Sequence, residues 1–189
     1  MPNFFSAFTS EVFRPIATLI IPGAIGISTW FVALLWHFAP LKQLVSENHT
    51  DTAFVALLAM IFAGLVFEDV GARWEVWLDG RADAKTEKLH SRQWFDYLRS
   101  AFVSDPIGRR YLRSLVLRLK FELGVAFAMT SAACGLVWLA FLGLNCRIVL
   151  VCILVCALFI AWGLNEANQT HQVLGRTRAE LLKDIRVVR

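Results

Sequence analysis

Four segments almost free of charge constrain the fold of this chain more than any other feature. They are Pro15–Ala39, Thr52–Phe67, Leu123–Leu144 and Ile148–Leu164, and the segments between them hold nearly every Lys and Arg. A water-soluble helix has a polar face that interrupts its apolar residues every few positions. Three of the segments approach or exceed the roughly 17–25 residues that a helix needs to cross a bilayer. The pattern predicts an all-α, polytopic membrane protein with four transmembrane helices.

The four segments group into two transmembrane hairpins joined by a helical cytoplasmic segment. The predicted regions are an N-terminal interfacial segment at 1–14, a first hairpin at 15–71, a basic amphipathic segment at 72–121, a second hairpin at 122–166 and a basic tail at 167–189. The composition agrees, since 57% of the 189 residues are hydrophobic and only 18% are charged. Too few residues remain outside the spans for a water-soluble domain of ordinary size.

The distribution of basic residues predicts the orientation. Most Lys and Arg lie between Ala72 and Phe121 or after Leu164, whereas the two remaining connections contain one base each, Lys42 and Arg147. Basic segments stay on the cytoplasmic side because they are poorly translocated. We therefore expect both termini and the central segment to be cytoplasmic, with 41–51 and 145–147 on the outer side.

Two of the spans contain small residues that suggest close helix packing. In the first span, Pro22, Gly23 and Gly26 predict either a packing kink or a hinge that lines a cavity. The third span carries a small-residue stripe that lets helix backbones approach, either within one protomer or between protomers. The stripe consists of Gly124, Ala128, Ser131, Ala132 and Gly135. The fourth span is bulky and aliphatic, which is typical of a lipid-facing helix.

The central segment is predicted to be helical. Asp79 and Gly80 suggest a break after the second span, and Trp94, Phe95 and Phe102 lie on one face of an amphipathic helix. A further basic helix follows and is expected to continue into the third span. Its Arg109, Arg110, Arg113 and Arg118 suit anionic lipid headgroups, a small helical bundle or a soluble partner protein. No fold signature supports direct binding of nucleic acid.

Acidic residues at the predicted inner boundary of the membrane are the sharpest local signal. They are Glu68, Asp69, Glu122 and Glu166. Carboxylates near hydrocarbon are costly unless they find bases or water. One interpretation is ion pairing with bases at the same level, namely Arg14, Arg73, Arg118 and Lys120. The other is an acidic belt around the mouth of an oligomeric pore, where it would favour cations.

The sequence contains no HExxH, GxSxG, Walker or GxGxxG motif, so no enzyme, metal site or cofactor is predicted. The run Glu68–Arg73, with Asp79 and Asp83 beyond it, is distantly similar to the carboxylate motif of CDP-alcohol phosphotransferases. That family holds two metals over a lipid substrate with aspartates from two adjacent spans. Here the spacing differs, and Asp79 and Asp83 lie outside any predicted span. A metal-dependent lipid-modifying enzyme is therefore a remote alternative.

The layout as a whole resembles the small four-span membrane subunits of bacterial anti-phage defence systems of the Kiwa type. This resemblance rests on architecture across the whole chain and on no specific motif, so it assigns no residue a role. It implies an inner-membrane homo-oligomer that senses infection or perturbs the membrane, together with a soluble partner. Our first hypothesis is an oligomeric pore or membrane-sensing component embedded in the lipid bilayer. The alternative is a membrane anchor that recruits a soluble cytoplasmic partner through 92–118.

Overall fold

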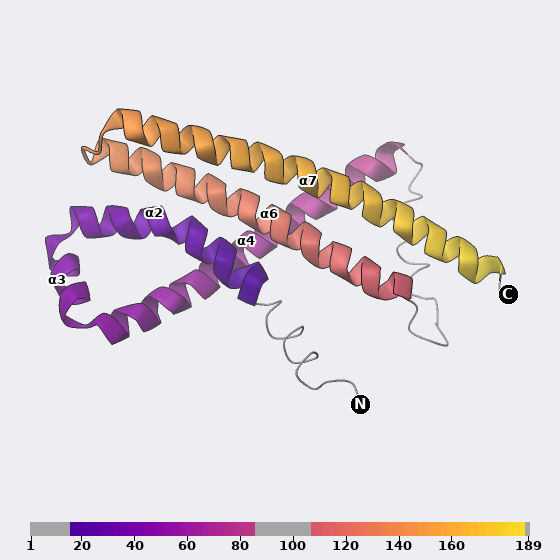
Figure 1. Ribbon diagram of the computed structural model, residues 1–189, viewed down its shortest axis with the longest axis horizontal. Coiled ribbons are helices and arrows are strands. Elements are labelled where there is room, and N and C mark those ends of the chain that lie inside the picture. Colours follow the sequence, from indigo (N-terminus) through magenta and orange to yellow (C-terminus); the bar gives the residue numbers. More distant parts are fainter. Residues whose placement is uncertain (1–15, 86–106, 188–189) are drawn as a thin grey trace.

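The structure is a computed structural model that describes residues 16–85 and 107–187, and these residues are helical without any strand (Figure 1). A π-helical turn, η1 (Ile16–Ile20), leads directly into the first α-helix. The five α-helices are α2 (Ile21–His37), α3 (Ala39–Glu47), α4 (His49–Lys85), α6 (Ile107–Phe141) and α7 (Cys146–Val187). The predicted interfacial segment at 1–14 and the predicted helix containing Trp94, Phe95 and Phe102 lie outside the described residues.

Four of the described helices are long and apolar enough to cross a membrane. The stretches are Thr18–His37, His49–Arg81, Tyr111–Phe141 and Cys146–Glu180. This finding is consistent with a multi-pass membrane protein, as the charge-free segments predicted. Three of the helices are also much longer than a span requires. At 1.5 Å per residue, the 42 residues of α7 reach about 63 Å, twice the roughly 30 Å of the hydrocarbon core.

The helices are arranged so that the molecule has two different ends. α6 and α7 lie side by side, and α2 packs along one half of α6 (Figure 1). α4 returns from α3 and passes behind α6 and α7. We call the end that contains α3 and the α6–α7 connection the turn end. The opposite end, where α4 and α7 finish and α6 begins, is called the charged end.

The connection between α6 and α7 is short, and it contains the C-terminal cap of α6 and the N-terminal cap of α7. Gly143 has φ 97°, a conformation that costs glycine little. The amide of Leu144 donates to the carbonyl of Leu139 and that of Gly143 to Ala140, the Schellman pattern of helix ends. The side chain of Asn145 then accepts a hydrogen bond of 3.0 Å from the amide of Arg147 and so caps α7.

Of two predictions about helix boundaries, one is wrong and one is confirmed. The predicted break at Asp79 and Gly80 is wrong, because α4 continues without interruption to Lys85. Glycine costs a helix only about 1 kcal/mol relative to alanine, which the packing of α4 offsets. The expected continuation of the basic helix into the third span is confirmed, since α6 runs from Ile107 to Phe141 without a break.

The hydrophobic core lies toward the charged end rather than in the middle of the apolar zone. Its buried members are Leu112, Leu115, Leu119, Leu123, Ala167 and Leu174, with Trp74, Val116, Phe127 and Leu164 packed against them. Burial of one leucine side chain stabilises a fold by roughly 1.5–3 kcal/mol. This core therefore holds α4, α6 and α7 together toward the charged end, beyond the most apolar part of each helix.

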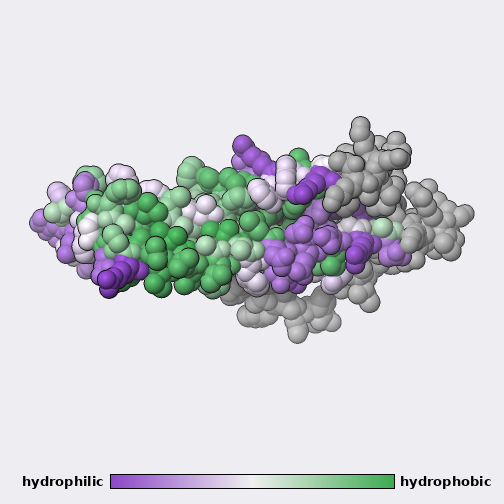
Figure 2. Space-filling model, turned by 90° about the horizontal axis from the view of Figure 1, so that it is seen from above, coloured by the Kyte–Doolittle hydropathy of each residue, from purple (hydrophilic) through white to green (hydrophobic). Residues whose placement is uncertain are grey.

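The surface divides along the length of the molecule. In Figure 2, hydrophobic side chains cover much of the half toward the turn end, with polar residues at its tip, whereas polar side chains dominate toward the charged end. On α7, the aliphatic stretch is largely exposed, including Leu150, Leu154 and Leu158, and Val149 is buried. Exposure of such residues is what a lipid-facing helix requires.

Candidate functional site

A layer of paired charges joins α4, α6 and α7 at the boundary between the apolar and polar halves. Nζ of Lys120 lies 2.9 Å from Oε1 of Glu68, and Arg118 contacts both Glu122 at 2.6 Å and Glu166 at 3.3 Å. We call these five residues the ionic layer. The bases all come from α6, whereas Glu68 comes from α4 and Glu166 from α7. The layer therefore ties α6 to both neighbours at one level.

Glu122 is the most enclosed member of the ionic layer, with a side chain only 10% exposed. Besides Arg118, it accepts a hydrogen bond of 2.9 Å from the hydroxyl of Thr170 on α7. Thr170 is itself buried. A carboxylate in this position is stabilised because each of its oxygens has a partner.

The ion pairing predicted from the sequence is confirmed for the described residues. Glu68, Glu122 and Glu166 take part in the ionic layer, whereas Asp69 pairs with Arg73 at 2.9 Å one turn along α4. Both side chains of that pair are mostly exposed, so it lies apart from the layer. Arg14, the fourth predicted base, lies outside the described residues. A role for the four acids at a pore mouth stays a prediction.

A second polar contact lies further toward the charged end. Nε2 of His171 on α7 is 2.8 Å from Oδ1 of Asp79 on α4, and the histidine side chain is only 7% exposed. Glu75, one turn before Asp79, is half-buried and within electrostatic range of Lys120, His171 and Arg178. Arg178 is buried as well. Charge of both signs is thus enclosed between the same helices that form the core.

Sequence reasoning missed Thr170, His171 and Arg178 because it treated 167–189 as a basic tail, and it missed Glu75 because it singled out only the acids at the ends of the spans. A signal was present: Ala167, Thr170, His171, Leu174 and Arg178 recur at three- and four-residue intervals. All five are buried on one face of α7. The face mixes small, polar and charged residues, so an apolar pattern alone does not reveal it.

The small-residue stripe of α6 packs against α2 within the protomer. The hydroxyl of Ser131 donates to the carbonyl of Gly26 at 3.0 Å, and that of Thr29 donates to the carbonyl of Ala132 at 3.0 Å. Trp30 Nε1 lies 3.0 Å from the carbonyl of Ser131. Among the remaining residues of the stripe, Gly124 faces Pro22, Ala128 is buried near Gly26, and Gly135 faces Thr29.

The glycines of the first span lie where α2 crosses α4. A methyl group at Gly23 would overlap the carbonyl oxygen of Met60, and one at Gly64 would overlap that of Leu19. Pro22 is buried in the first turn of α2, directly after the π-helical turn η1. These contacts support the packing interpretation of Pro22, Gly23 and Gly26. Their use as a hinge stays a prediction.

The residues expected to contact lipid or a partner are only partly described. Trp94, Phe95 and Phe102 lie outside the described residues, and of Arg109 and Arg110 only the backbone, in the first turn of α6, is described. Arg113 is exposed. Arg118 is 57% exposed, yet it is engaged in the ionic layer. Of the two roles predicted for Arg118, the structure therefore shows the ion pairing, and its contact with lipid or a partner stays a prediction.

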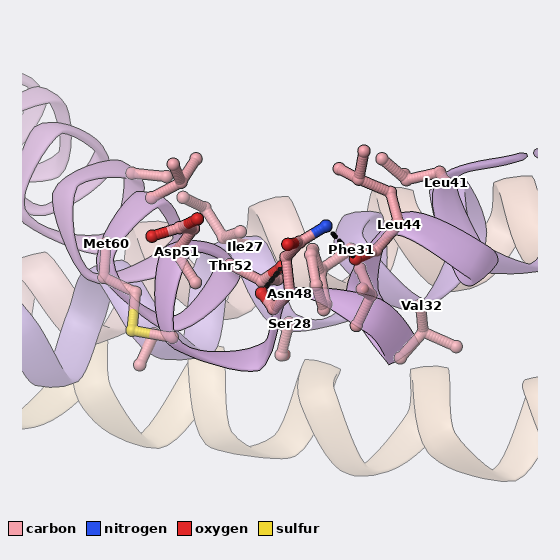
Figure 3. A pocket seen from close by; sticks show the side chains of 15 residues that line it. Ile27, Ser28, Phe31, Val32, Leu41, Leu44, Asn48, Asp51, Thr52 and Met60 are labelled. Atoms are coloured by element: carbon pink, nitrogen blue, oxygen red, sulfur yellow. Dashed lines mark hydrogen bonds between the residues drawn. The ribbon is translucent and has the colours of Figure 1, made fainter.

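A cavity of 640 Å³ lies between α2, α3 and the first half of α4 (Figure 3). This volume is within the range of ligand pockets in proteins. Most of its walls are apolar, and a few polar side chains come from α2 and from the start of α4. This cavity was not predicted, because α3 lies in what was expected to be a connection without a helix of its own.

The chemistry available in these sites is that of charge pairing and apolar binding. Among the described residues, no three His, Cys, Asp or Glu side chains are grouped so that they could hold a metal ion. Three carboxylates of the lipid-transferase alternative are engaged with bases: Glu68 with Lys120, Asp69 with Arg73 and Asp79 with His171. The side chain of Asp83 lies outside the described part of the structure. The chain has no significant match among protein-family models, curated proteins or solved structures.

Proposed function

We propose that this chain is a multi-pass inner-membrane protein that anchors and positions a soluble cytoplasmic partner. In this proposal the four spans form two hairpins, and both termini and the segment at 72–121 lie in the cytoplasm. One observation carries it: α4, α6 and α7 remain packed together beyond their apolar stretches. A helical stalk with a leucine core is a suitable platform for a second protein.

The charged end also offers contact groups for such a partner. Val76 and Trp77 on α4, Tyr111 on α6 and Val173 on α7 are exposed there. Arg113 adds an exposed positive charge on the same turn of α6 as Tyr111. Exposed aromatic side chains and arginine are enriched in protein interfaces. The basic character predicts a partner surface that is acidic.

An oligomeric pore has weaker support. The two features that favoured it were the acidic belt and the small-residue stripe of α6. Within the described residues, the acids pair with bases of the same protomer and the stripe packs on α2. Both features are therefore accounted for within one protomer. The architectural resemblance to anti-phage membrane subunits remains part of the proposal, because such a subunit would work with a soluble protein.

A crosslinking experiment tests the anchor function. A photoreactive amino acid at Tyr111 is expected to capture a soluble protein in cells that express the chain naturally. The same amino acid at Trp162, an exposed residue in the aliphatic half of α7, serves as the matched control and should capture none. Purified protein in vesicles should leave ion gradients intact. Leaky vesicles, together with crosslinks only between copies of the chain, would favour the pore instead.

A further inference from the structure

The cavity between α2, α3 and α4 exists because two helices cross closely and then separate. α4 meets α2 where Met60 faces Gly23, and it meets the preceding turn η1 where Gly64 faces Leu19. From that crossing α2 and α4 diverge toward the turn end, and α3 spans the gap between them (Figure 1). The close crossing fixes the narrow end of this wedge, so the space is a consequence of the helix geometry.

The walls of the cavity would suit a hydrocarbon chain. Ile27 and Phe31 come from α2, Leu44 from α3, and Val55 and Met60 from α4. Alanines on α4 provide the space between these larger side chains. The volume is sufficient for a ligand of moderate size, and such pockets combine apolar walls with a few polar groups.

The polar groups of the cavity differ in whether their hydrogen-bonding capacity is used. Ser28 donates to the carbonyl of Ile25, Thr52 to that of Asn48, and the amide of Asn48 lies 3.5 Å from the carbonyl of Leu44. Asp51 forms no hydrogen bond or ion pair with any described residue. Figure 3 shows its carboxylate beside the apolar residues that line the cavity. An available negative charge therefore borders an apolar space.

We propose that this cavity binds one hydrocarbon chain of an amphiphile whose headgroup carries an ammonium group. The chain would occupy the wedge between α2 and α4, and the ammonium would pair with Asp51. A headgroup that carries negative charge and no ammonium would be repelled by the same carboxylate. The ammonium could belong to an aminophospholipid or to a free alkylamine. The proposal requires the helices to be in a bilayer but no soluble partner, so it can fail independently of the anchor function.

Photolabelling of the full chain in phosphatidylcholine vesicles tests the proposal. The probe is an alkylamine with a diazirine in its chain, and the matched probe ends in a carboxylate instead. We expect the amine to label residues of the cavity and the carboxylate to label them about tenfold less, as expected for one charge-assisted contact. Added phosphatidylethanolamine that competes would identify the lipid as the source, and absence of competition would identify a free amine.

Three variants separate the cavity from general lipid contact. Asp51→Asn should lower labelling by the amine about tenfold, bringing it to the level of the carboxylate probe. Ala56→Phe should block the cavity, and Leu158→Phe, on the exposed face of α7, should change nothing. Asp51 is exposed, so its variant is expected to fold even if Ala56→Phe does not. Equal labelling by both probes, or labelling unaffected by Asp51→Asn, would overturn the proposal.

Discussion

Individual residues of the charged end show how polar groups are accommodated inside a helical bundle. His171 is buried, yet its ring nitrogen has a carboxylate 2.8 Å away. Thr170, its neighbour on α7, donates to Glu122 on α6. Adjacent residues of one helix thus bind α4 and α6 separately. A buried polar group is tolerated only when it has such a partner.

Loss of the contact between His171 and Asp79 should weaken the bundle. We expect His171→Ala to lower the free energy of unfolding by about 2 kcal/mol, because a buried side chain and its polar contact are lost together. A double-mutant cycle with Asp79→Asn should give a coupling energy of about 1 kcal/mol. The measurement is unfolding by SDS titration in mixed micelles. The exposed pair Asp69–Arg73 is the control, with an expected coupling below about 0.5 kcal/mol; equal coupling for both pairs would contradict this account.

At the scale of the elements, helices could be predicted where they depend on the residues of the helix itself and not on contacts with other helices. The four apolar stretches are visible because absence of charge over some twenty residues is a local signal. The break at Gly80 was predicted wrongly. The dipeptide Asp79–Gly80 is of a kind that ends many helices, but it is tolerated inside α4 because contacts with neighbouring helices stabilise α4 there. The pairing of Lys120 with Glu68 rather than with Glu166 depends on helix rotation, which sequence spacing does not fix across separate elements.

Glycines in the helices are expected to differ sharply in their response to substitution. Gly23→Ala and Gly64→Ala should each destabilise by about 1–3 kcal/mol, because the added methyl group overlaps backbone of the facing helix. Gly80→Ala should be neutral or stabilise by up to about 1 kcal/mol, since nothing lies within 4 Å of the added atom. Thermal unfolding in detergent compares the three. A loss at Gly80 as large as that at Gly23 would show that the crossing of α2 and α4 is not what makes these positions sensitive.

The whole molecule is organised along one axis, with an apolar half and a charged half (Figure 2). The division follows from composition and was expected. The ionic layer at the boundary was expected as acids beside bases, and its five members were all among the residues predicted to pair. The contact of Thr170 on α7 with Glu122 was not predicted. The cavity near the turn end was not foreseeable, because it depends on the angle between α2 and α4 and on α3 spanning the gap.

The proposed topology makes a prediction about accessibility. Cys146 is exposed at the turn end, so an impermeant maleimide should label it from outside intact cells. In a chain with all native cysteines replaced, a cysteine introduced at Arg176, which is exposed on α7, should react only after permeabilisation. The Cys146→Ala variant controls for reaction at the other native thiols. The opposite pattern of labelling would place the charged end outside and invalidate the proposed partner site.

The distribution of charges among the helices of the ionic layer affects the insertion of the protein into the membrane. α6 supplies both cations and Glu122, whereas Glu68 comes from α4 and Glu166 from α7. Some of these charges therefore lack their interhelical partners until the neighbouring helix is inserted. α4 leaves the ribosome first, so Lys120 can neutralise Glu68 as soon as α6 is inserted. Glu166 must wait until α7 is synthesised. Biogenesis should thus proceed through a three-helix intermediate that is retained at the insertion machinery and is vulnerable to membrane proteases until the final helix docks.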